Sequence, residues 1–406
     1  MLVGFGWINI LSASNQGEIN SYVDISQPYG KQFFFVGVSL ILIILILSIE
    51  AKFYERFSGL FYLGSILLLL GLFVFGKNVN GATSWYGIGG MTIQPSEFTK
   101  FATALALAKY ISDFQTNLKT IKHQLQAIVI IMIPAVLILL QNDAGSTLVY
   151  ASFFFVFYRE GIQQLYLLIV VSSVFLAVMV LKFDLLITAS VVTGCLALMY
   201  LLNRKGKTKI LTYVYVFIVA ILFSLTVKLA YQHILKPHQQ NRISLWLRLE
   251  KDPEKLEAMK RVEAYNLIQS EEAISSGGLL GKGLLQGTRT KGKYVPEQHT
   301  DYIFSTVGEE WGFVGSCSVV LLFVFLIGRL VFMAERQKNQ FSRIYGYGVA
   351  SILFFHFAIN IGMVMGLIPT VGIPLPFLSY GGSSLLGFTI LLFIFIKLDA
   401  NRLNEW

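Results

Sequence analysis

The sequence predicts an all-α polytopic membrane protein with about eleven or twelve transmembrane helices. Of its 406 residues, 55% are hydrophobic and only 14% are charged, whereas a soluble domain carries about 25% charged residues. The mean hydropathy is +0.65. The apolar runs are continuous rather than alternating. They favour helices over a closed barrel, and a membrane allows no third architecture because its interior offers backbone groups no water to bond.

A short apolar run and eleven longer ones follow one another along the chain. Residues 2–11 are apolar but polar residues begin at Ser12, so we expect a truncated first helix, either a stub or one whose start lies upstream. Pro134 is expected to kink its helix unless neighbours bond the freed carbonyl. The eleven predicted segments are 32–49, 57–76, 96–112, 125–141, 144–158, 165–182, 185–202, 210–232, 303–333, 344–367 and 384–398.

Basic residues in the short loops predict the orientation. They occur in alternate loops, which the positive-inside rule places in the cytoplasm. The segment 233–302 then lies outside, since loops longer than about 60 residues escape this rule. We therefore predict one multi-pass domain over 1–406 with a large extracytoplasmic loop at 233–302, and we attribute the net charge of +9 to loop bias rather than to nucleic-acid binding. The basic positions are Lys52, Arg56, Lys109, Lys119, Lys122, Arg159, Arg204, Lys205, Lys207, Lys209, Arg336, Lys338 and Arg343.

The long polar segment ends in Y-V-P-E-Q-H-T-D-Y-I-F, where it meets the next apolar run. Asp301 stands at that join. It can be the N-cap of the following helix, or a general base, because partial desolvation at the membrane edge raises a carboxyl pKa toward the working range. The residues alone leave both open. Glu297 and His299 beside it are candidate groove residues, and His299 with Asp301 is too small a set for a structural metal site.

Cations in the same segment are further candidates. Gly281 and Gly283 flank Lys282, and flexible glycines let backbone N–H groups approach an anion. The cations that could neutralise a pyrophosphate, or simply be solvated, are Arg242, Lys282, Arg289, Lys291 and Lys293.

Two other stretches are predicted to face outward with ionisable or aromatic side chains. Trp85 follows G-A-T-S and is either an interfacial anchor or a groove residue. Glu97 and Lys100 lie three apart at a helix start, and form either a structural ion pair or the polar floor of a groove. Asp143 is expected to cap the helix after it.

Residues 368–384 hold three prolines and several glycines, so they cannot form regular helix. Irregular backbone near a membrane survives where it is buried in protein or lines a cavity, and Ser379 is a candidate groove residue there. His356 and Asn360 share a face of the preceding helix. His356 is expected to be a packed polar residue rather than a ligand.

These motifs, taken together and in order, resemble the SEDS family of shape, elongation, division and sporulation proteins. They are G-A-x-x-W, Q-P-S-E-x-x-K, D-x-G-S, Q-S-x-x-A-I-x-S-G-G-L-x-G-K-G, Y-x-P-E-x-H-T-D-Y-I-F and P-L-P-x-x-S-Y-G-G-S-S, and the match extends from about Trp7 to the end of the chain. The stretch G-K-G-L-L-Q-G-T looks closer to RodA, the elongation member, than to FtsW, the division member.

The resemblance implies a peptidoglycan glycosyltransferase of the bacterial cytoplasmic membrane that polymerises lipid II for elongation and rod shape. It implies that Asp301 is catalytic, and it maps Trp85, Glu97 and Lys100 onto family motif positions. Transfer to a GlcNAc 4-hydroxyl inverts the donor's anomeric centre, so one base suffices. A divalent cation, Mg²⁺ or Mn²⁺, is an open alternative as cofactor. The resemblance also implies a partner, a class B penicillin-binding protein transpeptidase.

The chain departs from the family pattern in three places, one of which is the truncated first helix. The family usually has ten spanning helices, so we expect 185–232 to be an additional helical hairpin. Ser84 stands where the family commonly has Arg before Trp85. Alternative functions are a flippase or transporter of the lipid-linked precursor, a non-enzymatic scaffold, and a division-type rather than elongation-type polymerase.

Overall fold

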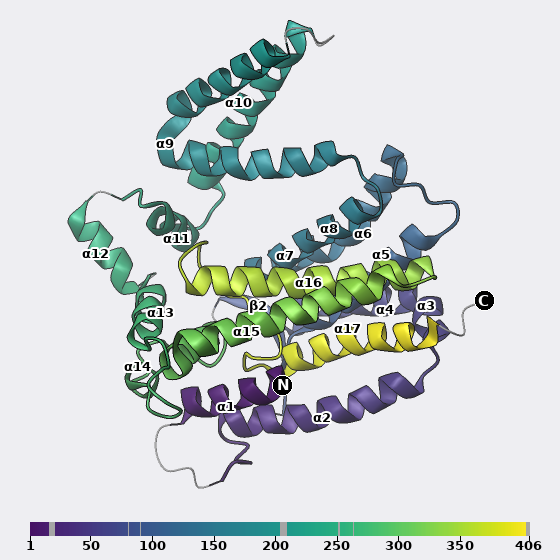
Figure 1. The fold of residues 1–406 in the computed structure, drawn as a ribbon, viewed down its shortest axis with the longest axis vertical. Coiled ribbons are helices and arrows are strands. Elements are labelled where there is room, and N and C mark those ends of the chain that lie inside the picture. The colour runs from purple at the N-terminus through teal and green to yellow at the C-terminus, as the bar shows by residue number, and fades with distance from the viewer. Residues whose placement is uncertain are drawn as a thin grey trace. The chain divides into compact units, whose positions relative to one another are not determined.

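The computed structural model describes residues 1–15, 21–79, 81–89, 91–203, 209–250, 252–262 and 264–402. The chain divides into two compact units, the first formed by 1–162 with 266–406 and the second by 163–265. Within the described residues, eight helices are long and apolar enough to cross a membrane. The predicted helical membrane architecture is therefore confirmed (Figure 1).

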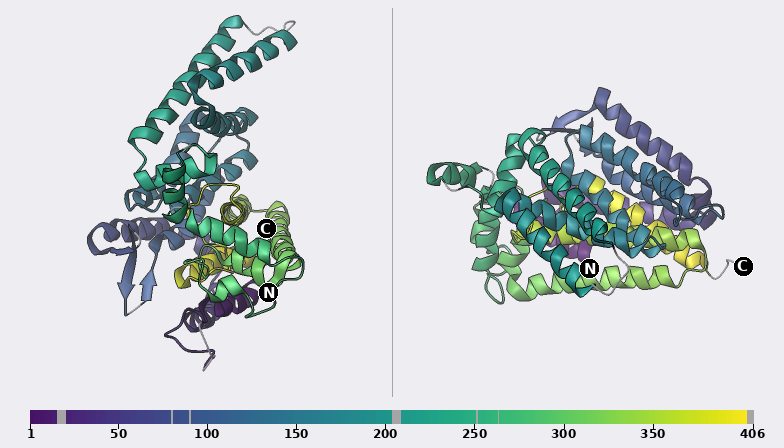
Figure 2. Two further views of the ribbon diagram at one scale, coloured as in Figure 1. Left: turned by 90° about the vertical axis from the view of Figure 1, so that its left-hand side faces the viewer. Right: turned by 90° about the horizontal axis from the view of Figure 1, so that it is seen from above.

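The first unit contains most of the helices. α2 packs along α17 and α5 packs along α16, so segments from the two ends of the chain lie side by side (Figures 1 and 2). Its helices are α1 (Leu2–Ser14), α2 (Pro28–Ser48), α3 (Ala51–Arg56), α4 (Ser58–Phe75), α5 (Pro95–Ser112), α6 (Ile121–Leu140), α7 (Ala144–Val149), α8 (Phe153–Arg159), α13 (Tyr265–Ser276), α14 (Thr288–Lys291), α15 (Ile303–Glu335), α16 (Gln340–Val364) and α17 (Gly382–Asn401).

Three predicted details of these helices have a counterpart in the structure. α1 is the short first helix that was expected. The predicted 144–158 segment is α7 and α8 joined by the 3-10 turn Tyr150–Ser152. Pro134 lies inside α6, which continues from Ile121 to Leu140 as one helix.

The second unit consists of α9 (Gln164–Leu202), α10 (Ile210–His233), α11 (Pro237–Leu247) and α12 (Pro253–Val262). α9 combines the two predicted segments 165–182 and 185–202, and Asp184 interrupts it with φ 66° and ψ 170°. α9 packs against α10. The predicted extracytoplasmic loop is largely helical, since α11 to α14 lie within 233–302.

A small antiparallel sheet, which the hydropathy of the sequence does not predict, follows α4. Its order is β1 (Lys77–Val79), β2 (Ala82–Ile88) and β3 (Met91–Ile93), drawn as arrows in Figure 2. Tyr86 donates its hydroxyl to the carbonyl of Leu68 at 2.8 Å, which fastens β2 to α4. The sheet leads directly into α5.

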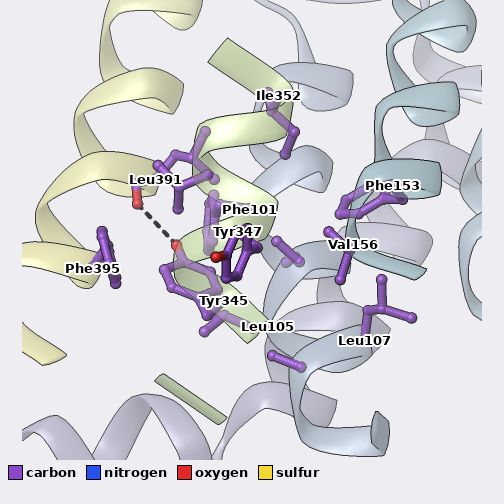
Figure 3. Close-up of a cluster of buried hydrophobic side chains, with 14 of the residues drawn as sticks. Phe101, Leu105, Leu107, Phe153, Val156, Tyr345, Tyr347, Ile352, Leu391 and Phe395 are labelled. Atoms are coloured by element: carbon purple, nitrogen blue, oxygen red, sulfur yellow. Dashed lines mark hydrogen bonds between the residues drawn. The ribbon is translucent and has the colours of Figure 1, made fainter. Parts of the chain in front are cut away.

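The apolar core lies where α5, α8, α16 and α17 meet (Figure 3). Phe153, Tyr345 and Phe395 are among its largest fully buried side chains. Tyr345 donates its hydroxyl to the carbonyl of Leu391 at 3.0 Å, so its one polar atom is bonded. Interiors of this kind are close-packed and rigid. α5 and α16 carry the polar residues of the candidate site, and this core fixes both helices.

Candidate active site

Asp301 lies between the polar segment and α15, and its side chain is half-buried. α15 begins at Ile303, and its N-cap position is Tyr302, which makes no side-chain capping bond. The N-cap position predicted as the alternative role of Asp301 therefore belongs to the next residue. A half-buried carboxylate at this place matches the other alternative, a group that can accept a proton from a bound molecule.

The backbone around Asp301 is held on its carbonyl side. Asn360, on α16, donates from Nδ2 to the carbonyl oxygen of Asp301 at 2.7 Å and to that of Ile373 at 2.6 Å. Ser379 donates from Oγ to the carbonyl of Thr300 at 2.6 Å. These bonds join the end of the polar segment, α16 and the Pro/Gly-rich stretch in one unit.

Gly372 lies against the carboxylate itself. A Cβ added at Gly372 would lie 3.2 Å from Oδ2 of Asp301, and the φ of Gly372 is +77°. Both the space and the backbone conformation favour glycine here. The Pro/Gly-rich stretch therefore passes close to Asp301, as its irregular sequence predicted for a segment lining a site.

Glu97 and Lys100 form a buried ion pair at 2.8 Å on α5, with each side chain 3% exposed. The ammonium of Lys100 also lies 3.0 Å from Nε2 of His356. An ammonium only donates, so Nε2 accepts and the imidazole proton is on Nδ1, which donates to the carbonyl of Pro374 at 3.1 Å. The Glu97–Lys100 pair is thus linked through His356 to the Pro/Gly-rich stretch, which also contacts Asp301. A role as a groove floor stays a prediction.

Ser379, Glu297 and His299 all lie beside Asp301. Ser379 is buried, and besides bonding Thr300 it accepts from the backbone N–H of Leu375 at 2.8 Å. Glu297 accepts from Oγ1 of Thr300 at 2.9 Å. The ring of His299 packs against that of Tyr380 at 5.5 Å. Burial lowers the pKa of His299, while Glu297 opposes and Lys293 reinforces this shift.

Two predicted anion-binding cations are paired with carboxylates. Lys282 lies 2.6 Å from Glu309, a fully buried residue of α15. Arg289 lies 2.6 Å from Glu272. Glu309 also accepts from the backbone N–H groups of Arg289 and Thr290 at 2.9 and 2.8 Å. Glu309 thereby holds the turn 288–290 in place, a role that sequence reasoning missed.

The other predicted groove residues belong to β2 and to α11. Trp85 is half-buried on β2, opposite Lys77 in the strand register. Arg242 lies on α11 of the second unit. Their roles in a groove stay predictions. Asp143 is the N-cap of α7 and accepts from the backbone N–H of Ser146 at 2.9 Å, so its predicted capping role is confirmed.

Among the residues that the structure describes, no three His, Cys, Asp or Glu side chains gather as a metal site. A divalent cation therefore has no candidate ligand set within that part of the chain, and its involvement stays an open alternative.

The spanning helices define a polytopic membrane protein. They surround a polar site that carries carboxylates, and such a site can serve as an active site. The model of a cell cycle protein family, FTSW_RODA_SPOVE, matches residues 1–184 and 157–404. The chain belongs to this family, the SEDS proteins of the resemblance described above. The two matches overlap at 157–184, so the break in the family pattern lies around the start of the second unit.

Named relatives and solved structures agree with this assignment. Peptidoglycan glycosyltransferase RodA of Treponema pallidum is 31% identical over 430 residues, covering 99% of this chain and 95% of that protein. Peptidoglycan glycosyltransferase MrdB of Escherichia coli K12 is 31% identical over 352 residues, covering 86% and 80%. The solved structure of RodA, the Rod shape determining protein of Thermus thermophilus, shares the fold with a TM-score of 0.62 at 23% identity, covering 100% and 95%. A chain of a peptidoglycan synthase complex has a TM-score of 0.67 at 23% identity, covering 100% and 96%.

Proposed function

We propose that this protein is a peptidoglycan glycosyltransferase that polymerises lipid II at the extracytoplasmic face of the bacterial cytoplasmic membrane, with Asp301 as its general base. Family membership and relatives named as such enzymes support the reaction class. The observation that carries the choice of Asp301 is the position of its half-buried carboxylate, against Gly372 and in a segment bonded to α16.

In the proposed reaction, the 4-hydroxyl of an acceptor GlcNAc attacks the anomeric carbon of the donor. The new oxygen–carbon bond forms as the bond to undecaprenyl pyrophosphate breaks, and the pyrophosphate leaves with the electron pair. Asp301 takes the hydroxyl proton. An α-linked donor gives a β-linked product, so the centre inverts and no covalent enzyme intermediate is needed. A divalent cation bound with the pyrophosphate would neutralise its charge.

The loop can also meet the leaving charge with its own cations. Lys291 and Lys293 are exposed, whereas Lys282 and Arg289 are engaged by carboxylates. We therefore assign the pyrophosphate contact to Lys291 and Lys293 before Lys282.

The test of the catalytic residue is Asp301→Asn in purified protein supplied with lipid II. Removal of a general base lowers the rate by about 10²- to 10⁴-fold, so glycan polymer should fall to near the detection limit while the thermal stability stays close to wild type. Asp24→Asn is the matched control, because Asp24 is an exposed carboxylate that accepts from the backbone N–H and the hydroxyl of nearby Ser26. Wild-type polymer yield from Asp301→Asn would remove the assignment.

The resemblance and the solved synthase complex support a partner of the class B penicillin-binding protein type. Such a transpeptidase would cross-link the strands that this protein makes. Co-purification of the two proteins from membranes tests this pairing. Depletion separates the cellular roles, since loss of an elongation enzyme gives rounded cells and loss of a division enzyme gives filaments.

One observation favours the rival function, a flippase for the lipid-linked precursor. Glu97, Lys100 and His356 form a charged cluster inside the helix bundle, and buried ionisable residues often mark transport pathways. Liposomes that hold the purified protein distinguish the two. A flippase moves lipid II between leaflets without making polymer, and Asp301→Asn would leave that movement intact.

A further inference from the structure

α15 is interrupted at Gly312, where φ is 64° and ψ is −159°. The segment 277–283, which we call the glycine tip, bonds to both sides of this interruption. The N–H groups of Lys282 and Gly283 donate to the carbonyls of Glu309 and Glu310, each at 3.0 Å. The N–H groups of Phe313 and Val314 donate to the carbonyls of residues 278 and 279, at 2.9 and 3.1 Å. The tip therefore satisfies helix groups that the interruption frees.

Glycines fix the glycine tip on the helix. A Cβ at Gly277 would lie 2.0 Å from the carbonyl oxygen of Gly308, and one at Gly281 would lie 2.1 Å from that of Glu310. A Cβ at Gly312 would lie 2.3 Å from the backbone nitrogen of Gly281. Backbone packs directly against backbone at this contact. The depth of the glycine tip in the bilayer is therefore set by the depth of Gly312.

The length of α15 gives the depth of Gly312 in the bilayer. From Phe313 to Glu335, α15 is about 34 Å long at 1.5 Å per residue, against about 30 Å for the hydrocarbon core of a bilayer. Phe313 and Val314 must therefore lie near one boundary of the hydrocarbon. Their side chains are 63% and 52% exposed on the protein surface, and those of Leu279 and Leu280 are 72% and 80% exposed.

We propose that Leu279 and Leu280 insert into the outer leaflet, so that the partner of this surface is membrane lipid. The leucines continue the lipid-facing surface of a spanning helix, to which the tip is directly bonded. The one charged residue in the sequence of the glycine tip is Lys282. Its Nζ is paired with Oε1 of Glu309 at 2.6 Å. A lipid anchor here holds the polar segment that leads to Asp301 at the level where lipid-linked headgroups stand.

The test uses protein with Cys195→Ala and Cys317→Ala, reconstituted as single copies in nanodiscs with no other protein. Leu280→Cys carries an environment-sensitive fluorophore. Phe325→Cys, exposed in the middle of α15, is the lipid control, and Lys291→Cys, exposed on α14, is the aqueous control. Because the discs hold lipid alone, any shielding of the fluorophore comes from lipid.

The expected result is a blue-shifted emission at Leu280→Cys, quenching by a nitroxide attached high on the acyl chain, and a loss of iodide quenching relative to Lys291→Cys. Iodide quenching equal to that of Lys291→Cys, with no effect of the nitroxide, would overturn the proposal. Neither result depends on catalysis, so a failure here leaves the glycosyltransferase assignment to be judged by the lipid II assay.

Discussion

Three consecutive residues before α15 each accept a hydrogen bond at the backbone carbonyl, and each bond comes from a different donor. Tyr380 N–H bonds the carbonyl of His299 at 2.8 Å, Ser379 Oγ bonds that of Thr300, and Asn360 Nδ2 bonds that of Asp301. A general base must lie within hydrogen-bond reach of the proton it takes. Holding its backbone in place before the substrate arrives reduces the ordering that the reaction requires.

Gly372→Ala should reduce activity through the carboxylate of Asp301. The new Cβ would lie 3.2 Å from Oδ2, so the carboxylate must move, and the left-handed φ adds a cost of about 1–2 kcal/mol for a residue with a Cβ. Polymer yield from lipid II and thermal stability are the two measurements. We expect kcat to fall more than the stability loss alone explains.

Gly89→Ala separates these two effects. Gly89 also has a positive φ, +55°, but a Cβ there meets nothing within 4 Å. It should lose a similar stability and keep its activity. If both variants lose activity equally, backbone strain rather than the contact with Asp301 is the cause.

His299 gives a pH dependence with a definite sign. Burial lowers its folded-state pKa below the ordinary 6.5, so the unfolded chain binds the proton first as the pH falls. Stability is unaffected above about pH 6.5 and decreases below it, down to the folded-state pKa. Thermal melts of wild type and His299→Gln between pH 5 and pH 8 check this. The variant should show a smaller loss at low pH, and parallel curves would contradict the argument.

At the scale of elements, α16 connects the site to the core. Asn360 and His356 are four residues apart and bond two carbonyls of the same stretch, those of Ile373 and Pro374. Their shared face could be predicted from helical spacing. Their partners could not, because hydropathy and periodicity describe one segment at a time and those partners lie in irregular backbone beyond the helix end.

Asn360→Ala should lower kcat and leave a buried carbonyl of Ile373 without its donor. An unsatisfied buried polar group costs about 1–3 kcal/mol, and Asp301 loses its link to α16. Asn339→Ala is the control on the same helix, because Asn339 caps its other end with a bond to the N–H of Phe341 at 2.8 Å, and such a cap contributes about 1 kcal/mol. Similar stability losses with activity lost only in Asn360→Ala support the positioning role, and equal activities refute it.

The sequence could not predict those elements that lack a strong local pattern of hydropathy. The spanning helices were predictable because each is a long apolar run. The strands β1 and β3 have three residues each, too few for an alternating pattern to show. The pairing of Lys282 with Glu309 joins residues 27 positions apart, so the sequence around Lys282 gives no sign that its charge is paired.

At the scale of the whole molecule, ion pairs collect at the helix ends opposite Asp301. Arg159 of α8 meets Glu335 of α15 at 2.7 Å, and Arg343 of α16 meets Glu160 at 3.0 Å. These residues lie at the helix ends that border the short loops assigned to the cytoplasm by the positive-inside rule. Asp301 lies at the other end of α15, about one helix length away, so the same rule assigns it to the outside.

The extracytoplasmic reaction depends on this orientation, which cysteine labelling tests. In a background with Cys195→Ala and Cys317→Ala, Lys291→Cys should react with a membrane-impermeant maleimide on intact spheroplasts, whereas Lys119→Cys should react only after lysis. Both positions are exposed on the protein surface, so access depends on the side of the membrane rather than on burial. Labelling of Lys291→Cys on intact spheroplasts would place Asp301 on the outer side of the membrane. A lipid-linked substrate with its headgroup outside can reach Asp301 only there. Labelling of Lys119→Cys alone on intact spheroplasts would place the carboxylate in the cytoplasm and end the proposed mechanism.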